Sequence, residues 1–466
     1  MYTIDGNIEI TAEVVCDYIS RHQYAIAAYD MLDNYYKGRH RILERTKGRE
    51  NLANNRIVCN HAKHIVDTAA GYLVGNPVTY KGRGGQNIEA LTDWLRLADS
   101  STQDMDVAKD AGIYGSALEL VYMSNEISPS PKLTEFDPRQ GFVVYDETVE
   151  HEPVFGVYYY PLYEITSGMI KGYNCRWITK AEQVDIELDA GMSPKLGTEA
   201  RVENVFGDVP LIEYDNNEEQ QGDFEQVIPL IDAYNLLQSD RVNDKEQFVN
   251  AILVLKGNTM GDTIEEASEA YKMMKQYGVL ELTQDGMAEW LTRTFSEESV
   301  EVLRRSLEQD IHKFSGVPCM SDESFAGNAS GVAMRYKLLG FEQIVKIKER
   351  YFREGLKKRI RLFCNVLSIK GQPAIDPEQV EISFTRNLPV NELENAQIVS
   401  MLQGVVPDEI LYNLLPFVED KAAAALLLQK QKEESIRQQQ KAFTAAANTA
   451  PDEDAEEVTN DEDAEP

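Results

Sequence analysis

The segment SALELVYM, residues 116–123, begins a series of short segments that favour β-structure. Four similar segments follow it: GFVVYDE (141–147), PVFGVYYY (153–160), GYNCRWIT (172–179) and EQVDIELD (182–189). They are rich in Tyr, Val and Ile and are separated by residues that form turns, which is typical of strands joined by hairpins. The region from 116 to 214 is therefore predicted to form an antiparallel sheet.

Helical periodicity lies on both sides of this region. The predicted helices are 11–36, a second that carries Val58 to Leu73 on one face, 87–98, 102–114, 223–249, 296–315, 331–367 and segments after 388. Asn54 or Asn55 is the expected N-cap of the second helix, and Pro229 is tolerated because it falls in the first turn of its helix. Because strands and helices do not alternate as βαβ units, the predicted fold class is α+β.

A small mixed module is expected between the helices 223–249 and 296–315. AILVLKG (251–257) is strand-like, and a helix follows it with a capping box from Thr263 to Glu266. VLELTQDGMAEWLT (279–292) is predicted to be a hairpin that turns at Asp285-Gly286. The two flanking helices would then form a stalk that carries this module.

The helix predicted over 331–367 has two different faces. Its apolar side chains are Phe341, Val345, Phe352, Leu356, Ile360 and Phe363, and its basic stripe is Lys346, Arg350, Arg353, Lys357 and Arg361. Lys348 and Arg359 fall near the apolar arc, so the two faces are not cleanly separated. This helix follows a polar, Gly-containing loop over 316–330, which by itself is typical of an ordinary connection between helices.

Composition limits the function classes. Lys and Arg number 46 against 78 Asp and Glu, so the net charge is -32 and gives no overall electrostatic reason to bind nucleic acid tightly. Five scattered cysteines read as free thiols of a reducing cytoplasm. We expect no secretory signal and no membrane-spanning segment. The last stretch, PDEDAEEVTNDEDAEP, has no basic residue and is expected to be disordered.

Motifs for catalysis are weak or missing. His61 and His64 in NHAKH are three residues apart on a predicted helix and have a spacing that suits a metal, but no carboxylate accompanies them, so a structural or surface role is favoured. The Gly-rich segment KGRGGQN (81–87) matches neither a dinucleotide loop nor a Walker loop. The sequence therefore predicts no enzyme activity, no cofactor and no metal.

Five blocks in order give the chain a resemblance to a known family. They are YYKGRHRI (35–42), NNRIVCNHAKHIVDTAAGYLVGNPVTY (54–80), AGIYGSALELVY (111–122), FGDVPLIEYDNNEEQQGDFEQVIPLIDAYNLLQSDRVNDKEQF (206–248) and SGVPCMSDESFAGNASGVAMRYKLLGFE (315–342). The chain resembles the portal proteins of tailed double-stranded DNA phages, of the siphophage type found in phages of Gram-positive bacteria. The blocks span residues from about 30 to 367.

The resemblance implies a ring, usually of twelve subunits, at one capsid vertex, with double-stranded DNA passing non-specifically through its centre. It implies a wing at 1–222 and 331–387, stem helices at 223–250 and 296–315, a clip at 251–295, a tunnel loop at 316–330, crown helices at 388–443 and an acidic tail at 444–466. The implied partners are the terminase large subunit, the head-completion (adaptor) protein, and the major capsid and scaffold proteins, with no membrane. The implied location is the virion, and the host cytoplasm during assembly.

The resemblance also assigns candidate site residues. Those of the tunnel loop are Ser321, Ser324, Phe325, Gly327, Asn328, Ser330 and Gly331. The candidate contacts to DNA or to neighbouring subunits are Lys346, Arg350, Arg353 and Lys357, and the partner-binding residues of the clip are Glu265, Glu266, Lys272 and Asp285. The alternatives are another phage head protein without a channel, such as a minor capsid or scaffold-binding protein, and a metal-dependent nuclease. Ring formation separates the first of these from a portal.

Overall fold

The computed structural model describes residues 2–46, 53–126, 129–248, 252–256, 263–277, 287–291, 297–319, 336–386 and 392–402, with single residues and short runs between 405 and 440. The chain divides into two compact units. The first comprises residues 1–327 and 337–387, and the second comprises 328–336 and 388–466. In the second unit, α10 (Glu392–Leu402) is an 11-residue helix. The rest of this description concerns the first unit.

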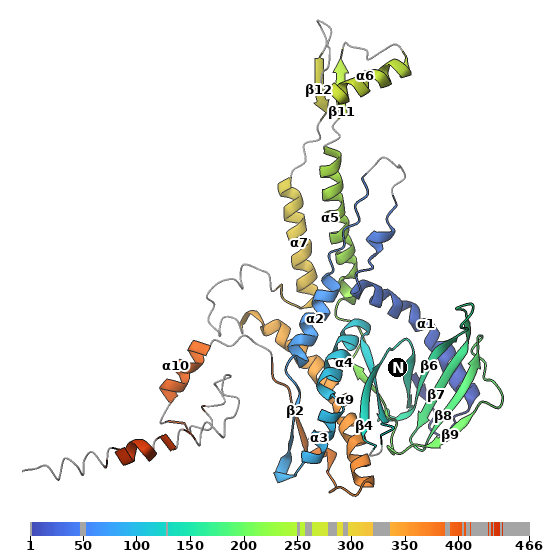
Figure 1. Ribbon diagram of the computed structural model, residues 1–466, viewed down its shortest axis with the longest axis vertical. Helices are drawn as coiled ribbons and strands as arrows, with labels where there is room; N and C mark the ends of the chain where they lie inside the picture. Colours follow the sequence, from blue (N-terminus) through green and yellow to red (C-terminus); the bar gives the residue numbers. More distant parts are fainter. Residues whose placement is uncertain are drawn as a thin grey trace, which may run out of the picture. The chain divides into compact units, whose positions relative to one another are not determined.

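Two sheets lie at the centre of the first unit (Figure 1). The larger has six strands in the order β1-β5-β6-β7-β8-β9, and the smaller has three in the order β10-β3-β4. Their bounds are β1 Tyr2–Ile4, β5 Gly141–Asp146, β6 Pro153–Tyr163, β7 Ile170–Thr179, β8 Glu182–Asp189 and β9 Ala200–Glu203, then β10 Leu211–Asp215, β3 Ser116–Met123 and β4 Pro131–Phe136. All pairs are antiparallel except that β1 runs parallel to β5.

The prediction of a single antiparallel sheet over 116–214 is therefore only partly right. The segments from Gly141 to Asp189 do form consecutive hairpins, but β3 pairs with β4 and β10 and belongs to the smaller sheet. The two sheets share a core in which Leu118 and Leu211 of the small sheet meet Val143 and Tyr158 of the large one. Packing of the two sheets buries both their facing surfaces, which one flat sheet would leave exposed.

The other face of the large sheet is covered by α1 (Ala12–Tyr36) (Figure 1). Val15, Tyr18 and Ile19 of this helix are buried in one core with Phe155 and Trp177 of the sheet. Thr11 accepts a hydrogen bond from the Val14 N–H at 3.4 Å and so caps the helix. Where both faces of the large sheet are covered, β5 and β6 contain near-continuous apolar runs, whereas β8 alternates between buried and more exposed residues.

Four helices of the unit form a layer on the small sheet. They are α2 His61–Val74, α3 Glu89–Leu97, α4 Ser100–Tyr114 and α9 Leu339–Ile369. In this layer α4 and α9 contact the strands, and α2 and α3 pack against these two helices. All six apolar residues predicted for the long helix are buried, which confirms its orientation. The expected N-cap of α2 was wrong: Asn60, not Asn54 or Asn55, accepts from the Lys63 N–H at 3.0 Å. A two-stranded sheet joins β2 (Thr79–Gly82) to β13 (Val380–Ser383).

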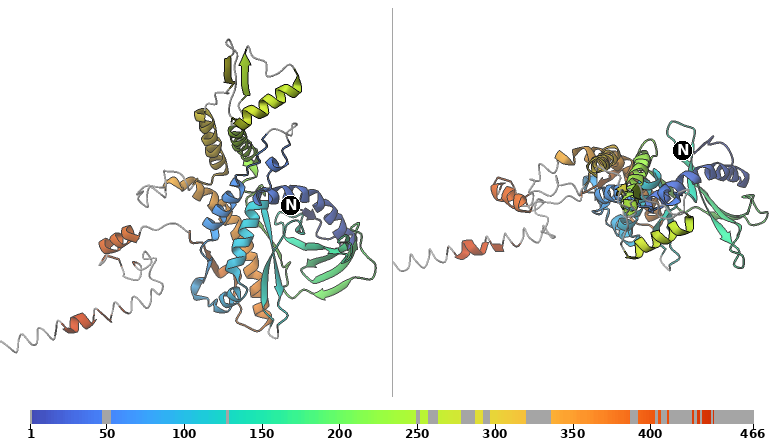
Figure 2. Two further views of the ribbon diagram at one scale, coloured as in Figure 1. Left: turned by 45° about the horizontal axis from the view of Figure 1, so that its top comes forward. Right: turned by 90° about the horizontal axis from the view of Figure 1, so that it is seen from above.

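Two helices, α5 (Ile228–Phe248) and α7 (Glu297–Ser315), pack side by side (Figure 2). The chain between them contains β11 (Ile252–Lys256), α6 (Ile264–Tyr277) and β12 (Met287–Leu291). β12 pairs with β11 in antiparallel fashion, and the segment 278–286, which includes the predicted turn at Asp285-Gly286, lies outside the described residues. Half of the predicted capping box is confirmed, since the Glu266 N–H donates to Thr263 Oγ1 at 3.3 Å.

Candidate functional site

Buried ion pairs hold α9 against α4 and the small sheet. Arg359 is fully buried, and its Nη1 lies 2.6 Å from Asp104 Oδ1 of α4. Its Nη2 and Nε donate to the two carboxylate oxygens of Glu119 on β3 at 2.7 and 2.8 Å. The Tyr214 hydroxyl of β10 donates to the same carboxylate at 2.8 Å. Although burial alone would lower it, these carboxylates raise the pKa of Arg359 well above its ordinary value.

A second buried ion pair lies about three turns earlier on α9. Lys348 Nζ is 2.5 Å from Asp223 Oδ2, and both side chains are less than a tenth exposed. Asp223 also accepts from Asn216 Nδ2 at 2.9 Å and precedes the first turn of α5. Lys348 and Arg359, the two cations on the apolar arc, therefore form buried ion pairs that link α9 to other elements, and they do not belong to a solvent-facing basic surface.

The predicted basic stripe separates into internal and external members. Arg353 donates to the Ile382 carbonyl at 2.5 Å and to Glu349 at 2.6 Å, and its guanidinium stacks over Phe384. It therefore holds β13 against α9, with 31% of its side chain still exposed. Arg350 is exposed and forms no ion pair within the described part of the chain.

Lys346 and Lys357 also remain accessible. Lys346 lies 3.9 Å from Glu342 with 63% of its side chain exposed, and Lys357 lies 2.9 Å from Glu354 with 47% exposed. Exposed pairs of this kind contribute at most about 1 kcal/mol, so both ammonium groups are free to exchange partners. Lys346, Arg350 and Lys357 are therefore the candidate contacts with the most accessible charges; Arg361, the remaining member of the stripe, is also 47% exposed and lies 3.8 Å from Glu378.

Ion pairs match α5 to α7 along their length. Arg241 of α5 lies 3.1 Å from Glu301 of α7, and Lys245 lies 2.9 Å from Glu297. Arg304 of α7 bonds back to the Tyr234 hydroxyl of α5 at 3.2 Å. These contacts fix how α7 is aligned along α5, because each arginine or lysine named here has its acceptor on the facing helix.

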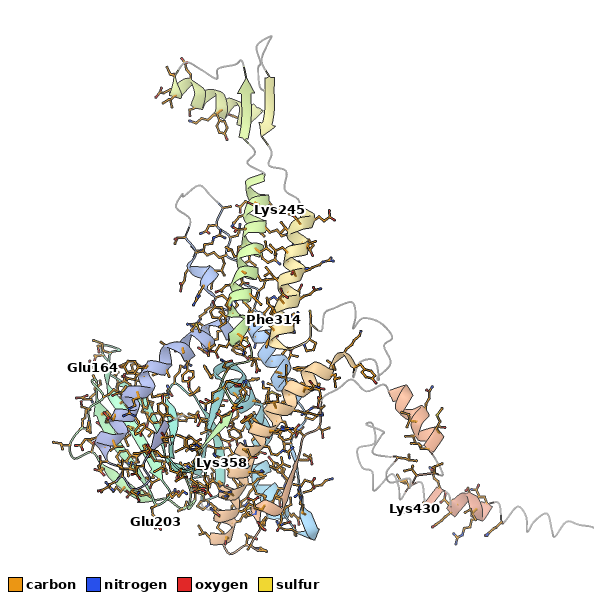
Figure 3. The ribbon with its side chains drawn as sticks, turned by 180° about the vertical axis from the view of Figure 1, so that it is seen from behind. Glu164, Glu203, Lys245, Phe314, Lys358 and Lys430 are labelled. Atoms are coloured by element: carbon orange, nitrogen blue, oxygen red, sulfur yellow. The ribbon has the colours of Figure 1, made fainter. Side chains whose placement is uncertain are left out.

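Large apolar side chains are exposed along α7 and on the first turns of α9. Leu303 is 50% exposed and Phe314 is 59% exposed on α7, while Ile344 and Ile347 are 38% and 49% exposed on α9. Figure 3 shows Phe314 at the end of α7 next to the start of α9, whereas Leu303 lies about three turns earlier on α7. Exposed apolar surface of this kind is often covered by another protein surface.

Gly316 fixes the start of the connection from α7 to α9. Its φ is +70°, a conformation that favours glycine, and a Cβ at this position would lie 2.0 Å from Ile344 Cδ1. The first residues of the predicted loop 316–330 are thus held against α9. The candidate residues further along this loop lie outside the described residues: Ser321, Ser324, Phe325, Gly327, Asn328, Ser330 and Gly331.

Three histidines meet at the base of the paired helices. The His312 ring of α7 has its centroid 5.7 Å from that of His61 and 5.8 Å from that of His64, both on α2. The other side of His61 packs edge-on against Tyr234 of α5 at 4.8 Å. His312 Nδ1 donates to the Val317 carbonyl at 3.0 Å, because a carbonyl can only accept. His61 and His64, for which a structural or surface role was predicted, therefore lie beside a third histidine that the sequence did not connect to them.

Burial decides the protonation of His61 and His312. Together with a smaller effect of the neighbouring His312, it lowers the pKa of His61 to about 4. Burial also lowers the pKa of His312, although the bond to Val317 opposes the change. Both rings are therefore neutral at pH 7. Within the residues that the structure describes, no group of three or more His, Cys, Asp and Glu side chains is arranged to hold a metal ion.

The candidate residues of the module lie on α6. Glu265, Glu266 and Lys272 are exposed, so they are accessible to a partner, while Asp285 lies outside the described residues. None of the described helices combines the length and apolar character that crossing a bilayer requires.

The partners of the buried cations were missed from the sequence. Glu119 could have been noticed, since a carboxylate in the middle of an apolar strand needs a cation.

The family model and the two curated relatives both identify portal proteins as similar to this chain. The model of the family described as phage portal protein, SPP1 Gp6-like, matches residues 17–438. The portal protein of Clostridium phage phiCD119 is 26% identical over 385 residues, which cover 79% of this chain and 83% of the relative. The portal protein of Bacillus phage SPP1 is 24% identical over 383 residues, covering 79% of this chain and 74% of the relative. A solved chain titled "Neck of empty GTA particle computed with C6 symmetry" aligns with a TM-score of 0.42 and 14% identity, covering 76% of this chain and 89% of that one.

Proposed function

This chain belongs to the SPP1 Gp6-like family of phage portal proteins, and we propose that it forms a ring at one capsid vertex through which double-stranded DNA enters and leaves the particle. Its role is then structural, and the chain is a component of the phage particle. The observation that carries the ring is the uncovered apolar surface formed by α7 and the first turns of α9. In this proposal another copy of the chain covers it.

The proposed contact is heterologous, because the α7 and α9 surface of one copy meets a different surface of the next. Contacts of this kind close into rings when the rotation between copies allows it. Covering Leu303 and Phe314, each at least half exposed, removes apolar area from water at about 25 cal/mol per Å². The exposed cations Lys346, Arg350 and Lys357 would meet a neighbour that is acidic overall, since the chain as a whole has a net charge of -32.

The oligomeric state tests this proposal. Light scattering after size exclusion, followed by negative-stain images, should show rings with a central hole. Leu303→Glu combined with Phe314→Glu should shift the chain to smaller species, while Gln309→Glu on the same helix, at an exposed polar position, should leave rings intact. A monodisperse monomer at every concentration would overturn the ring. Rings unchanged by the double variant would place the interface elsewhere.

The loop 316–330 is proposed to line the narrowest part of the channel. Serines and Asn328 offer weak, exchangeable contacts to phosphates, and Gly327 and Gly331 give the backbone freedom to follow a moving helical surface. A mostly acidic ring supports this role, because few lysine or arginine contacts release counterions and DNA is therefore not retained. The fixed Gly316 would provide a firm anchor at one end of the loop.

Packaging assays on proheads test the loop. Asn328→Lys adds one cation per subunit, so DNA should stall in the channel and the defect should lessen as the salt concentration rises. Replacing Gly327 and Gly331 with valine should leave folded rings but impair packaging at all salt concentrations. Normal packaging by both variants would favour an ordinary connection between helices over a channel loop.

The module β11-α6-β12 is proposed to bind the terminase large subunit and later the head-completion protein. The exposed charges of α6 support this role, since they lie on a short helix with solvent around Glu265 and Lys272. Glu265→Lys and Lys272→Glu should weaken terminase capture by assembled rings, whereas Glu298→Lys on α7 serves as a matched control. Unchanged capture by both α6 variants would move the docking site elsewhere.

The proposal extends to the remaining parts and locations. Residues 388–443 would form the crown and 444–466 an acidic tail, and the chain would reside in the host cytoplasm until it joins the capsid and scaffold proteins. Truncation after residue 450 should leave ring assembly unchanged, because the removed segment contains nine acidic residues and little apolar surface. Loss of rings on truncation would contradict this assignment.

A further inference from the structure

We propose that His61, His64 and His312 form a proton-sensitive joint that holds α7 against α2 at neutral pH and releases it in acid. This inference does not depend on the channel or on the ring. It rests on the position of the three rings, which meet where the end of α7 lies against α2, next to the buried side chains of Ile311 and Val317. α7 ends at Ser315, three residues after His312, and the chain continues directly into the connection toward α9.

The geometry leaves little room for charge. Two imidazole rings of α2 lie within 6 Å of the ring of His312, so protonation of all three would place three cations in one cluster. His312 is 8% exposed, and water therefore provides little screening. Its bond to Val317 occupies Nδ1 as a donor, so an added proton goes to Nε2, on the side of the ring that this bond leaves open.

The surrounding groups do not neutralise such a charge. From α5, Tyr234 presents an aromatic edge to His61, and its hydroxyl already accepts from Arg304 at 3.2 Å. From α7, Glu308 favours protonation of both rings, but Arg304 holds it at 2.7 Å. His40, from the segment before α2, adds a further repulsive effect on His61 when charged.

The expected size follows from linkage. In the closed joint burial lowers the pKa of His61 to about 4, and in an open joint water would return it to 6.5. Protons therefore bind the open form first, and the open population grows as the pH falls below 6.5. Between pH 7.5 and 5.5 His61 alone raises that population about tenfold, and His312 acts in the same direction.

Hydrogen exchange on the assembled full chain measures this opening. Protection of peptides that cover 305–319, corrected for the intrinsic exchange rate at each pH, should fall at least about tenfold from pH 7.5 to 5.5. In a triple variant, His61→Phe keeps an aromatic ring against Tyr234, His64→Gln keeps a polar side chain, and His312→Asn keeps an amide N–H near the place of Nδ1 for the bond to Val317, while the titration of all three is removed. This triple variant should show a flat profile, whereas His151→Asn, in an exposed loop far along the chain, should behave as the parent does.

Two results would overturn the joint. One is a parent chain whose protection over 305–319 does not change with pH. The other is a triple variant with the same pH dependence as the parent, which would assign the effect to other groups. If the triple variant does not fold, His61→Phe alone carries the test, because it removes the titration on which the tenfold change was calculated and leaves the bond from His312 to Val317 in place.

Discussion

Replacement of Arg359 by methionine tests whether buried charge fixes the long helix. The guanidinium donates to Asp104 and to both oxygens of Glu119, and all three side chains are almost entirely buried. Methionine fills much of the same volume but leaves two carboxylates in the core without a cation. Removing one partner of a buried ion pair costs about 3–5 kcal/mol, mostly because the remaining charge is desolvated.

The expected loss can be expressed as a melting temperature. In a unit of this size each kcal/mol corresponds to about 2 °C, so Arg359→Met should lower the unfolding midpoint by about 6–10 °C. Arg350→Met on the exposed face of the same helix should change it by about 1 °C. Scanning calorimetry of the two variants and the parent at one scan rate provides the comparison.

The pH dependence identifies the cause. In Arg359→Met the isolated carboxylates have folded-state pKa values raised above their unfolded values, so the deficit should be large at pH 8 and smaller at pH 5. Adding Asp104→Asn and Glu119→Gln removes the stranded charges and should restore at least half of the loss. A midpoint for Arg359→Met within 2 °C of the Arg350→Met value would refute the reasoning, because the salt bridges would then not hold α9.

Three further predictions follow from the packing of the first unit. Lys348→Met should lower the unfolding midpoint by several degrees, and adding Asp223→Asn should recover most of it, as a double-mutant cycle in calorimetry would show. Gly115→Ala should destabilise by more than about 2 kcal/mol, since φ is +87° and the new Cβ would lie 2.0 Å from the Gln220 carbonyl oxygen; unchanged urea unfolding would contradict this. Burial lowers the pKa of His22 to about 4, so the unfolded chain binds that proton first and stability should fall from pH 7 to 5; His22→Gln should flatten this part of the profile, and an unaltered slope would assign it to other groups.

The elements with a strong local pattern could be predicted from the sequence. The segment SALELVYM and the segment EQVDIELD form strands over 116–123 and 182–189, with the predicted bounds. The first helix covers Ala12–Tyr36 against a predicted 11–36, and Pro229 lies in the first turn of its helix. These features depend on side-chain periodicity and on residues a few positions apart, which the sequence displays directly.

Pairings between distant segments were beyond the sequence. β1 joins β5 in parallel across about 140 residues, and β2 joins β13 across about 300, although each of these edges has only three or four residues. The short strands at these edges carry too little side-chain periodicity to be recognised from the sequence alone. The sequence also did not show that β3 belongs to a second sheet, because the neighbour with which a strand pairs depends on which surfaces the folded chain buries.

The sequence by itself determined the order of elements, the α+β class, the apolar face of the long helix and the blocks that resemble phage portal proteins. Only the tertiary structure decided that Lys348 and Arg359 are buried and that Arg353 bonds to β13, while Lys346, Arg350 and Lys357 face outward. It also decided that His312 joins His61 and His64. The physical reason is that charge and protonation depend on burial and on partners far away in the chain, whereas periodicity depends on neighbours within a few residues.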